Sequence, residues 1–166
     1  MDNEQPWYER VVFPALLRHA RTTYGKAMRS ALDQAGYDDI PANGLYIIGG
    51  LALGDGDIPL RQLVRELGIT KQGAGQLVDA LVMRGYLSRT VDEKDRRQLI
   101  VALTDRGRGA ADIQAQARER IDNELLERVG ETDLLAARRV LGTLIDIRND
   151  EAAGAKVRNG ATARSH

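Results

Sequence analysis

The sequence predicts a mainly α-helical protein in which a helix-turn-helix and a small β-hairpin are flanked by longer helices. Apolar residues recur every three or four positions along most of the 166 residues, and glycines divide this pattern at several points. One stretch, residues 86–103, instead alternates with a period of two, which is typical of strands. A chain of this length is expected to form a single structural domain.

The N-terminal region, residues 11–57, follows a polar lead of residues 1–10 and is predicted to hold two helices. The first is expected from about residue 11 to residue 35, with Pro14 in its first turn and Gly36 as its C-terminal stop. A second helix of about a dozen residues is expected to begin at Pro41. These helices are expected to support the rest of the fold and to take part in dimerisation.

Residues 58–103 carry the pattern of a winged helix-turn-helix. A short helix is expected from about Leu60 to Leu67, and a second one begins directly after Thr70, whose hydroxyl can cap it. Two alternating strands then enclose the charged loop at residues 92–97, so the loop is expected to project as a wing.

Two long helices are predicted within residues 104–148. Thr104 is expected to cap the first of them, and apolar residues from Ile113 to Ile145 recur at helical spacing. Because amphipathic helices need a surface that covers their apolar face, a second subunit is the expected partner of these helices. Residues 149–166 are polar and rich in alanine and glycine, which predicts a disordered tail.

The composition excludes several classes of protein. There is no cysteine, so disulfides and thiolate metal sites are excluded, and the two histidines, His19 and His166, are too few for a metal site. We expect no cofactor and no metal. No nucleophile motif or phosphate-binding loop predicts an enzyme. The chain has neither a signal-peptide pattern nor a membrane-spanning apolar run, and we expect a cytoplasmic protein.

The charge is distributed unevenly although the net charge is zero. Residues 58–110 contain ten Lys and Arg against six Asp and Glu, a net of +4, whereas residues 1–57 carry −3 and residues 111–166 carry −1. A basic middle third is expected if that part of the chain faces a polyanion.

Residues from about 10 to 148 resemble the MarR family of regulators. Three stretches carry the resemblance: residues 63–70, LVRELGIT; residues 77–81, LVDAL, with residues 85–89, GYLSR; and Asp95-Arg96-Arg97 followed by residues 103–107, LTDRG. The third is the most specific. The resemblance implies a homodimeric, sequence-specific regulator of transcription that binds double-stranded operator DNA.

A helix in the major groove reads base edges with residues near its N-terminus, and here these are Lys71, Gln72 and Gln76. Gly73 and Gly75 weaken this turn, which indicates a close backbone approach to DNA or to the preceding helix, or else a poorly formed turn. The resemblance assigns Arg97 to the minor groove, where Asp95 would hold it. The expected DNA-binding residues are Thr70, Lys71, Gln72, Gly73, Gln76, Arg89, Lys94, Asp95, Arg96 and Arg97, of which Arg89, Lys94 and Arg96 suit phosphates.

The resemblance also implies a pocket for a small effector, often a phenolic or other aromatic acid, that weakens DNA binding. The candidate residues are Arg18, His19, Tyr24, Met28 and Tyr46, each of which also fits an ordinary core or surface position. Repression is favoured over activation, because a dimer lying on a promoter competes with polymerase. The alternative function is a protein-interaction module that has lost operator binding, a reading supported by the zero net charge and the two helix-weakening glycines.

Overall fold

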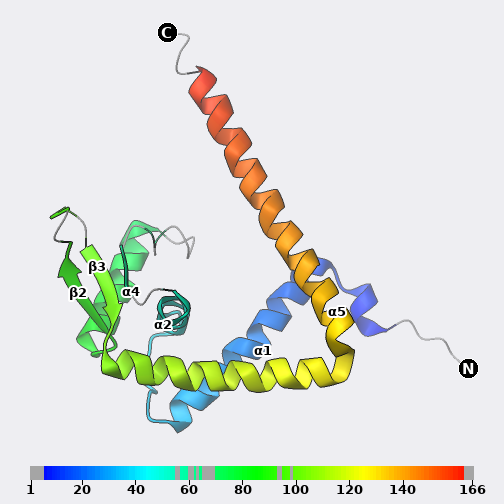
Figure 1. Cartoon of the computed structure of the whole chain (residues 1–166), viewed down its shortest axis with the longest axis horizontal. Coiled ribbons are helices and arrows are strands. Elements are labelled where there is room, and N and C mark those ends of the chain that lie inside the picture. Colours follow the sequence, from blue (N-terminus) through cyan, green and yellow to red (C-terminus); the bar gives the residue numbers. More distant parts are fainter. Residues whose placement is uncertain are drawn as a thin grey trace, which may run out of the picture. The chain divides into compact units, whose positions relative to one another are not determined.

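The computed structural model describes residues 6–54, 57–59, 62, 64, 70–92, 95–97 and 99–162. The chain divides into two units, residues 1–121 and residues 122–166, and each is described by itself. The predicted fold class is confirmed, since the described residues are mostly helical and include one small antiparallel sheet (Figure 1). No helix among the described residues has both the length and the apolar character needed to cross a bilayer.

The predicted N-terminal helices are present. After the 3-10 helix η1 (Trp7–Arg10), helix α1 (Phe13–Gln34) has a proline in its first turn, as expected. Gly36 follows its C-cap and terminates the helix, because a φ of 82° lets the Tyr37 N–H donate to the Leu32 carbonyl over 2.9 Å. Helix α2 (Gly44–Leu53) begins three residues later than predicted, because Pro41 forms a turn in which its carbonyl accepts from the Gly44 N–H over 2.7 Å.

The helix-turn-helix is described only in its second half. Of the predicted first helix, Gln62 and Val64 are helical and the other positions lie outside the described residues. The second helix, α4 (Lys71–Met83), begins where Thr70 predicted. It ends at Gly85, whose φ is 75°.

The sheet contains one strand more than the sequence predicted. The expected hairpin is formed by β2 (Leu87–Val91) and β3 (Leu99–Leu103), which pair antiparallel from Leu87↔Leu103 to Val91↔Leu99. The unpredicted strand is β1 (Asp57–Pro59), which pairs with the other edge of β3 and gives the order β1-β3-β2. Three residues are too few to show a period of two, and proline is tolerated on an edge strand because one side of that strand makes no ladder bonds.

The core of the first unit packs α1, α2 and α4 with the sheet and the beginning of α5 (Asp105–Thr162), the C-terminal helix. Its largest fully buried side chains are Tyr86, Leu32, Ile47, Ile48, Leu51, Leu81, Leu87, Gln114, Val78 and Val101. Small residues of α5, among them Ala110 and Ala117, complete the core. This core fixes α4 and the hairpin as one body, with α4 in contact with β2.

Helix α5 (Asp105–Thr162) is interrupted at Gly130, whose φ of 77° and ψ of 167° are not helical. The two long helices predicted for residues 104–148 are therefore present as its two parts. Helical backbone continues to Thr162, where the sequence predicted a disordered tail from Asn149 onward. Several alanines in this stretch favour helix, which explains the difference.

Candidate nucleic-acid interface

The N-terminal turn of α4 is built by its cap. The Gly73 N–H donates to Thr70 Oγ1 over 3.1 Å, which satisfies one of the free donors that begin every helix. A Cβ on Gly73 would lie 3.2 Å from the same oxygen, so the glycine fits closely against the cap. A Cβ on Gly75 would meet no described atom within 4 Å. Gly73 thus lies against the cap of its own helix, and the approach to DNA or to the preceding helix expected at the two glycines stays a prediction, since most of that preceding helix lies outside the described residues.

The buried face of α4 decides which residues point outward. Ala74, Val78 and Leu81 are buried, and their spacing places them on one side of the helix. The polar residues off this face are exposed: Lys71, Gln72 and Gln76 near the start of the helix, and Asp79 farther along it. This first turn and a half of α4 thus presents one ammonium and two amides to the outside, side chains that suit base edges.

The wing tip is organised by its aspartates. Asp95 Oδ1 accepts from the Arg97 N–H over 3.1 Å, and Asp92 Oδ1 accepts from the Asp95 N–H over 3.4 Å. Asp95 therefore contacts Arg97 through the backbone, in the local turn that Asp side chains favour. Arg96 and Arg97 are exposed. Lys94 lies outside the described residues.

Arg89 joins the wing to α4. Its Nη1 lies 2.5 Å from Asp79 Oδ1, and both side chains are partly exposed, at 40% and 54%. The phosphate contact expected for Arg89 would thus come from a guanidinium that also has a carboxylate partner. This ion pair fixes the first strand of the hairpin against the outer face of α4.

A second polar cluster, which sequence reasoning missed, lies at the other end of α4. It consists of Asp39 before α2, Tyr86 before β2 and Arg106 in the first turn of α5. Tyr86 Oη donates to Asp39 Oδ1, and Arg106 Nη2 donates to Asp39 Oδ1 over 3.0 Å and to Tyr86 Oη over 3.1 Å. Arg106 Nη1 donates to the Arg84 carbonyl over 2.7 Å, and its guanidinium lies 4.4 Å from the centre of the Tyr86 ring.

The electrostatics of this cluster are those of a carboxylate held between two donors. The hydrogen bond from Tyr86 and the charge of Arg106 lower the pKa of Asp39. Burial, together with the hydrogen bond to Asp39, raises the pKa of Tyr86 to about 12. At neutral pH Asp39 is therefore ionised and Tyr86 keeps its proton.

Residues 103–107, LTDRG, lead from β3 into α5 and bind the backbone of the segment between α4 and β2. The Thr104 N–H donates to the Tyr86 carbonyl over 3.1 Å, and Thr104 Oγ1 accepts from the Gly107 N–H over 3.1 Å, which confirms the predicted cap of α5. A Cβ on Gly107 would lie 2.1 Å from the Tyr86 carbonyl oxygen. Glycine is required here by the close approach of α5 to the backbone between α4 and β2.

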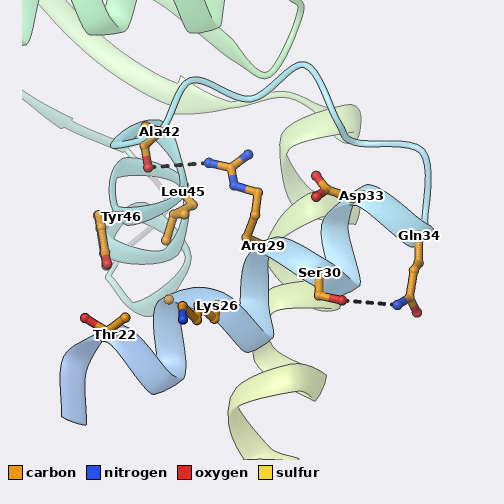
Figure 2. Close-up of a pocket in the computed structure, with 10 residues that line it drawn as sticks. Thr22, Lys26, Arg29, Ser30, Asp33, Gln34, Ala42, Leu45 and Tyr46 are labelled. Atoms are coloured by element: carbon orange, nitrogen blue, oxygen red, sulfur yellow. Dashed lines mark hydrogen bonds between the residues drawn. The ribbon is translucent and has the colours of Figure 1, made fainter. Parts of the chain in front are cut away.

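A separate cavity of about 520 Å³, wide open to solvent, lies between α1 and α2 (Figure 2). Its lining residues include Thr22, Lys26, Arg29, Ser30 and Tyr46. Arg29 donates to the carbonyls of Ile40, Pro41 and Ala42 over 2.8, 3.2 and 3.4 Å.

Of the five residues expected at an effector site, only Tyr46 lines this cavity. Met28 is buried in the core and Tyr24 packs against it. Arg18 and His19 are exposed on α1 and do not line the cavity. Lys26 and Arg29, which sequence reasoning missed, do line it, and only the packing of α1 on α2 could have identified them. Among the described residues no group of His, Asp and Glu could hold a metal ion.

Comparisons with known proteins agree with this architecture. A family model described as "MarR family" matches residues 39–98. The uncharacterized HTH-type transcriptional regulator YwhA of Bacillus subtilis (strain 168) is 25% identical over 114 residues, covering 69% of this chain and 81% of the relative.

Solved structures extend the likeness to most of the chain. Streptococcus pneumoniae FabT in complex with DNA superposes with a TM-score of 0.71 at 20% identity, covering 86% of this chain and 98% of that one. A mutant MarR from E. coli complexed with operator DNA gives 0.66 at 17% identity, covering 84% and 98%. At these identities the solved structures show the fold alone, and the family model adds that residues 39–98 are similar to the MarR family.

Proposed function

We propose that this protein is a sequence-specific, double-stranded DNA-binding regulator of transcription. The observation that carries the proposal is the outer face of α4, where Lys71, Gln72 and Gln76 are exposed beside a hairpin whose tip carries Arg96 and Arg97. A capped helix start of this composition suits the major groove. Two solved structures of the same fold with DNA bound, FabT and a mutant MarR, support the proposal that this face of α4 contacts DNA.

The residues have different roles in this proposal. Lys71, Gln72 and Gln76 contact base edges, whereas Thr70 and Gly73 allow the start of α4 to approach the sugar-phosphate backbone. In the wing, Arg97 enters the minor groove, with its backbone held by Asp95. Arg96, Arg89 and Lys94 contact phosphates and add affinity that does not depend on sequence.

The protein acts as a homodimer in this proposal. In the second unit the helix carries exposed apolar residues at helical spacing, with Leu141, Leu144 and Ile145 exposed to 43%, 39% and 51%. An apolar stripe of this length needs a partner surface, and a second copy of the chain supplies a matching one. Two copies of α4 about 34 Å apart would reach successive major grooves on one side of DNA.

The cavity between α1 and α2 is our candidate for an effector site. Tyr46 offers an aromatic ring, Lys26 and Arg29 offer two positive charges against the one carboxylate of Asp33, and Thr22 and Ser30 offer hydroxyls, a set of net positive charge that suits a small aromatic acid. A ligand that binds better to a conformation in which the spacing of the two α4 helices no longer matches the major grooves would release the protein from DNA. The protein would then act as a ligand-responsive repressor. Calorimetry with a panel of aromatic acids should detect binding that Lys26→Gln weakens. No heat from any of them would remove the effector from the proposal.

The alternative, a protein-interaction module without operator binding, makes a different prediction for salt. Binding to phosphates releases counterions, so the affinity of a groove binder for duplex DNA falls steeply with rising salt. An interaction module would bind duplex DNA weakly or not at all. The exposed cations of α4 and of the wing favour the groove binder.

The proposed function is tested by Arg97→Ala. We expect this variant to lose about 1–3 kcal/mol of binding free energy on a duplex selected by the wild-type protein from randomised DNA. Arg128→Ala is the control, because it removes the same charge from an exposed residue that pairs with Glu124 in the second unit. Equal affinity of Arg97→Ala and the control would remove the wing from the proposal, and failure of the wild type to select any sequence would refute operator binding.

A further inference from the structure

The polar cluster of Asp39, Tyr86 and Arg106 joins three segments that are distant in the sequence. Asp39 lies 47 residues before Tyr86 and 67 residues before Arg106. The three residues come from the loop before α2, the connection from α4 to β2, and the first turn of α5. The cluster therefore ties the exit of α4 and the entry of the wing to two neighbouring elements.

Arg106 is the centre of this cluster. Its Nη1 contacts the Arg84 carbonyl at the end of α4, its Nη2 contacts Asp39 and the Tyr86 hydroxyl, and its plane covers the Tyr86 ring. One guanidinium thus has polar contacts on two sides and an aromatic contact on its face. Only the planar fork of arginine can make these contacts together, because a lysine ammonium is a single point charge.

The surroundings of the cluster are themselves fixed. Arg29 binds the three carbonyls that directly follow Asp39, so the loop carrying this carboxylate is held from the side of α1. Thr104 binds the Tyr86 backbone and Gly107 packs against it. A carboxylate and a guanidinium anchored in this way can set the direction in which α4 leaves the core.

We propose that Arg106 is a positioning residue for sequence-specific DNA binding. Together with Asp39 and Tyr86, it sets the angle of α4 and of the hairpin against α5. It does not contact DNA itself. The inference rests on the proposed function. Arg106 lies at the C-terminal end of α4, whose 13 residues separate it from the base-reading turn by about 18 Å. Its side chain acts through Asp39, Tyr86 and the Arg84 carbonyl.

This role differs measurably from a direct phosphate contact and from a purely structural role. A lost phosphate contact weakens binding to every duplex and reduces the salt slope by about 0.9. Loss of fold lowers the folded fraction and both affinities together. A displaced α4 weakens binding to the preferred sequence while binding to unrelated DNA, which depends on phosphates, stays the same.

The test uses the full-length protein, a duplex selected by the wild type from randomised DNA, and a scrambled duplex of equal length and composition. Arg106→Lys keeps the charge and loses the fork, and Asp39→Asn removes the shared acceptor charge from a partly exposed position. Arg108→Lys is the matched control, because Arg108 also lies in the first turns of α5 and contacts Leu103 and Asp105 rather than the end of α4.

We expect Arg106→Lys and Asp39→Asn each to lower the affinity for the selected duplex about tenfold, a size typical of coupled contacts. The affinity for the scrambled duplex and the salt slope should stay at the wild-type values, as should both affinities of Arg108→Lys. Affinities are compared at equal folded fraction, measured by circular dichroism. Wild-type affinity of both variants, or an equal loss on both duplexes, would overturn the positioning role alone. A wild type that selects no sequence would overturn the proposed function as well.

Discussion

Gly107→Ala tests whether the first turn of α5 packs directly against the backbone between α4 and β2. The new methyl carbon would lie 2.1 Å from the Tyr86 carbonyl oxygen and 3.0 Å from Leu103 Cδ2. Carbon and oxygen atoms in close contact are normally about 3.3–3.6 Å apart. The first turn of α5 would therefore have to move by more than about 1 Å from the backbone that it packs against.

The cost follows from what that movement disrupts. Overpacking a tight contact costs about 1–3 kcal/mol. The Tyr86 carbonyl also accepts from the Thr104 N–H over 3.1 Å, and the Thr104 hydroxyl is shared between the Gly85 and Tyr86 carbonyls over 2.6 and 3.0 Å. The N–H bond and the shared hydroxyl bond each contribute about 1 kcal/mol. Alanine returns about 1 kcal/mol through its higher helix propensity. We expect the free energy of unfolding to fall by about 2–4 kcal/mol.

Urea unfolding followed by circular dichroism measures this change, at one fixed protein concentration because the stability of a dimer, which we propose for this chain, depends on concentration. The midpoint should fall by about 1–2 M urea. Gly50→Ala is the control, since Gly50 is an exposed helical glycine with nothing within 4 Å of its added Cβ, and it should gain up to about 1 kcal/mol. Gly107→Ala with the stability of the wild type would show that α5 does not approach the Tyr86 backbone this closely.

Two further predictions concern Thr70 and Tyr86. Thr70→Ala removes the acceptor of the Gly73 N–H and should destabilise the protein by about 1 kcal/mol in thermal unfolding, whereas Thr70→Ser should keep most of the stability; equal losses in both variants would contradict the cap. The raised pKa of Tyr86 means that the stability of the wild type relative to Tyr86→Phe is present in full below pH 10 and is lost as the pH rises from 10.0 to about 12. Urea unfolding across this pH range should show the difference narrowing, and a constant difference would contradict the pKa shift.

The sequence alone predicted the local features of this fold correctly. The cap at Thr70 follows from one hydroxyl placed before an apolar helical pattern, and the end of α1 follows from Gly36, because both depend on neighbours within a few residues. The hairpin follows from its period of two. Strand β1 was missed for the opposite reason: three residues carry no period, and their pairing with β3 depends on a segment more than 40 residues away.

In the candidate site, too, the features that depend on neighbouring residues could be predicted and those that depend on distant residues could not. The exposure of Gln72 and Gln76 could be predicted, since it follows from the helical spacing of the buried residues of α4. The cluster around Arg106 could not, because its partner Asp39 is 67 residues away and nothing in either local pattern indicates the pair. Lys26 and Arg29 were missed as cavity residues because the packing of α1 on α2 decides which side of α1 faces the cavity.

The tertiary structure also shows where the positive charge of a chain with zero net charge is exposed. The cations in the basic middle third have two kinds of surroundings. In the first kind, a carboxylate lies beside the cation, as it does for Arg89, Arg106 and Arg108. Lys71, Arg96 and Arg97 are exposed and form no ion pair with another described residue. Among the described residues, exposed cations with no carboxylate partner therefore lie at the start of α4 (Lys71), at its end (Arg84) and at the wing tip, while Arg89 keeps guanidinium donors beyond the one that binds Asp79. The count of charges predicted only that this third was basic, whereas the ion pairs of the fold determine which of its cations have a carboxylate beside them.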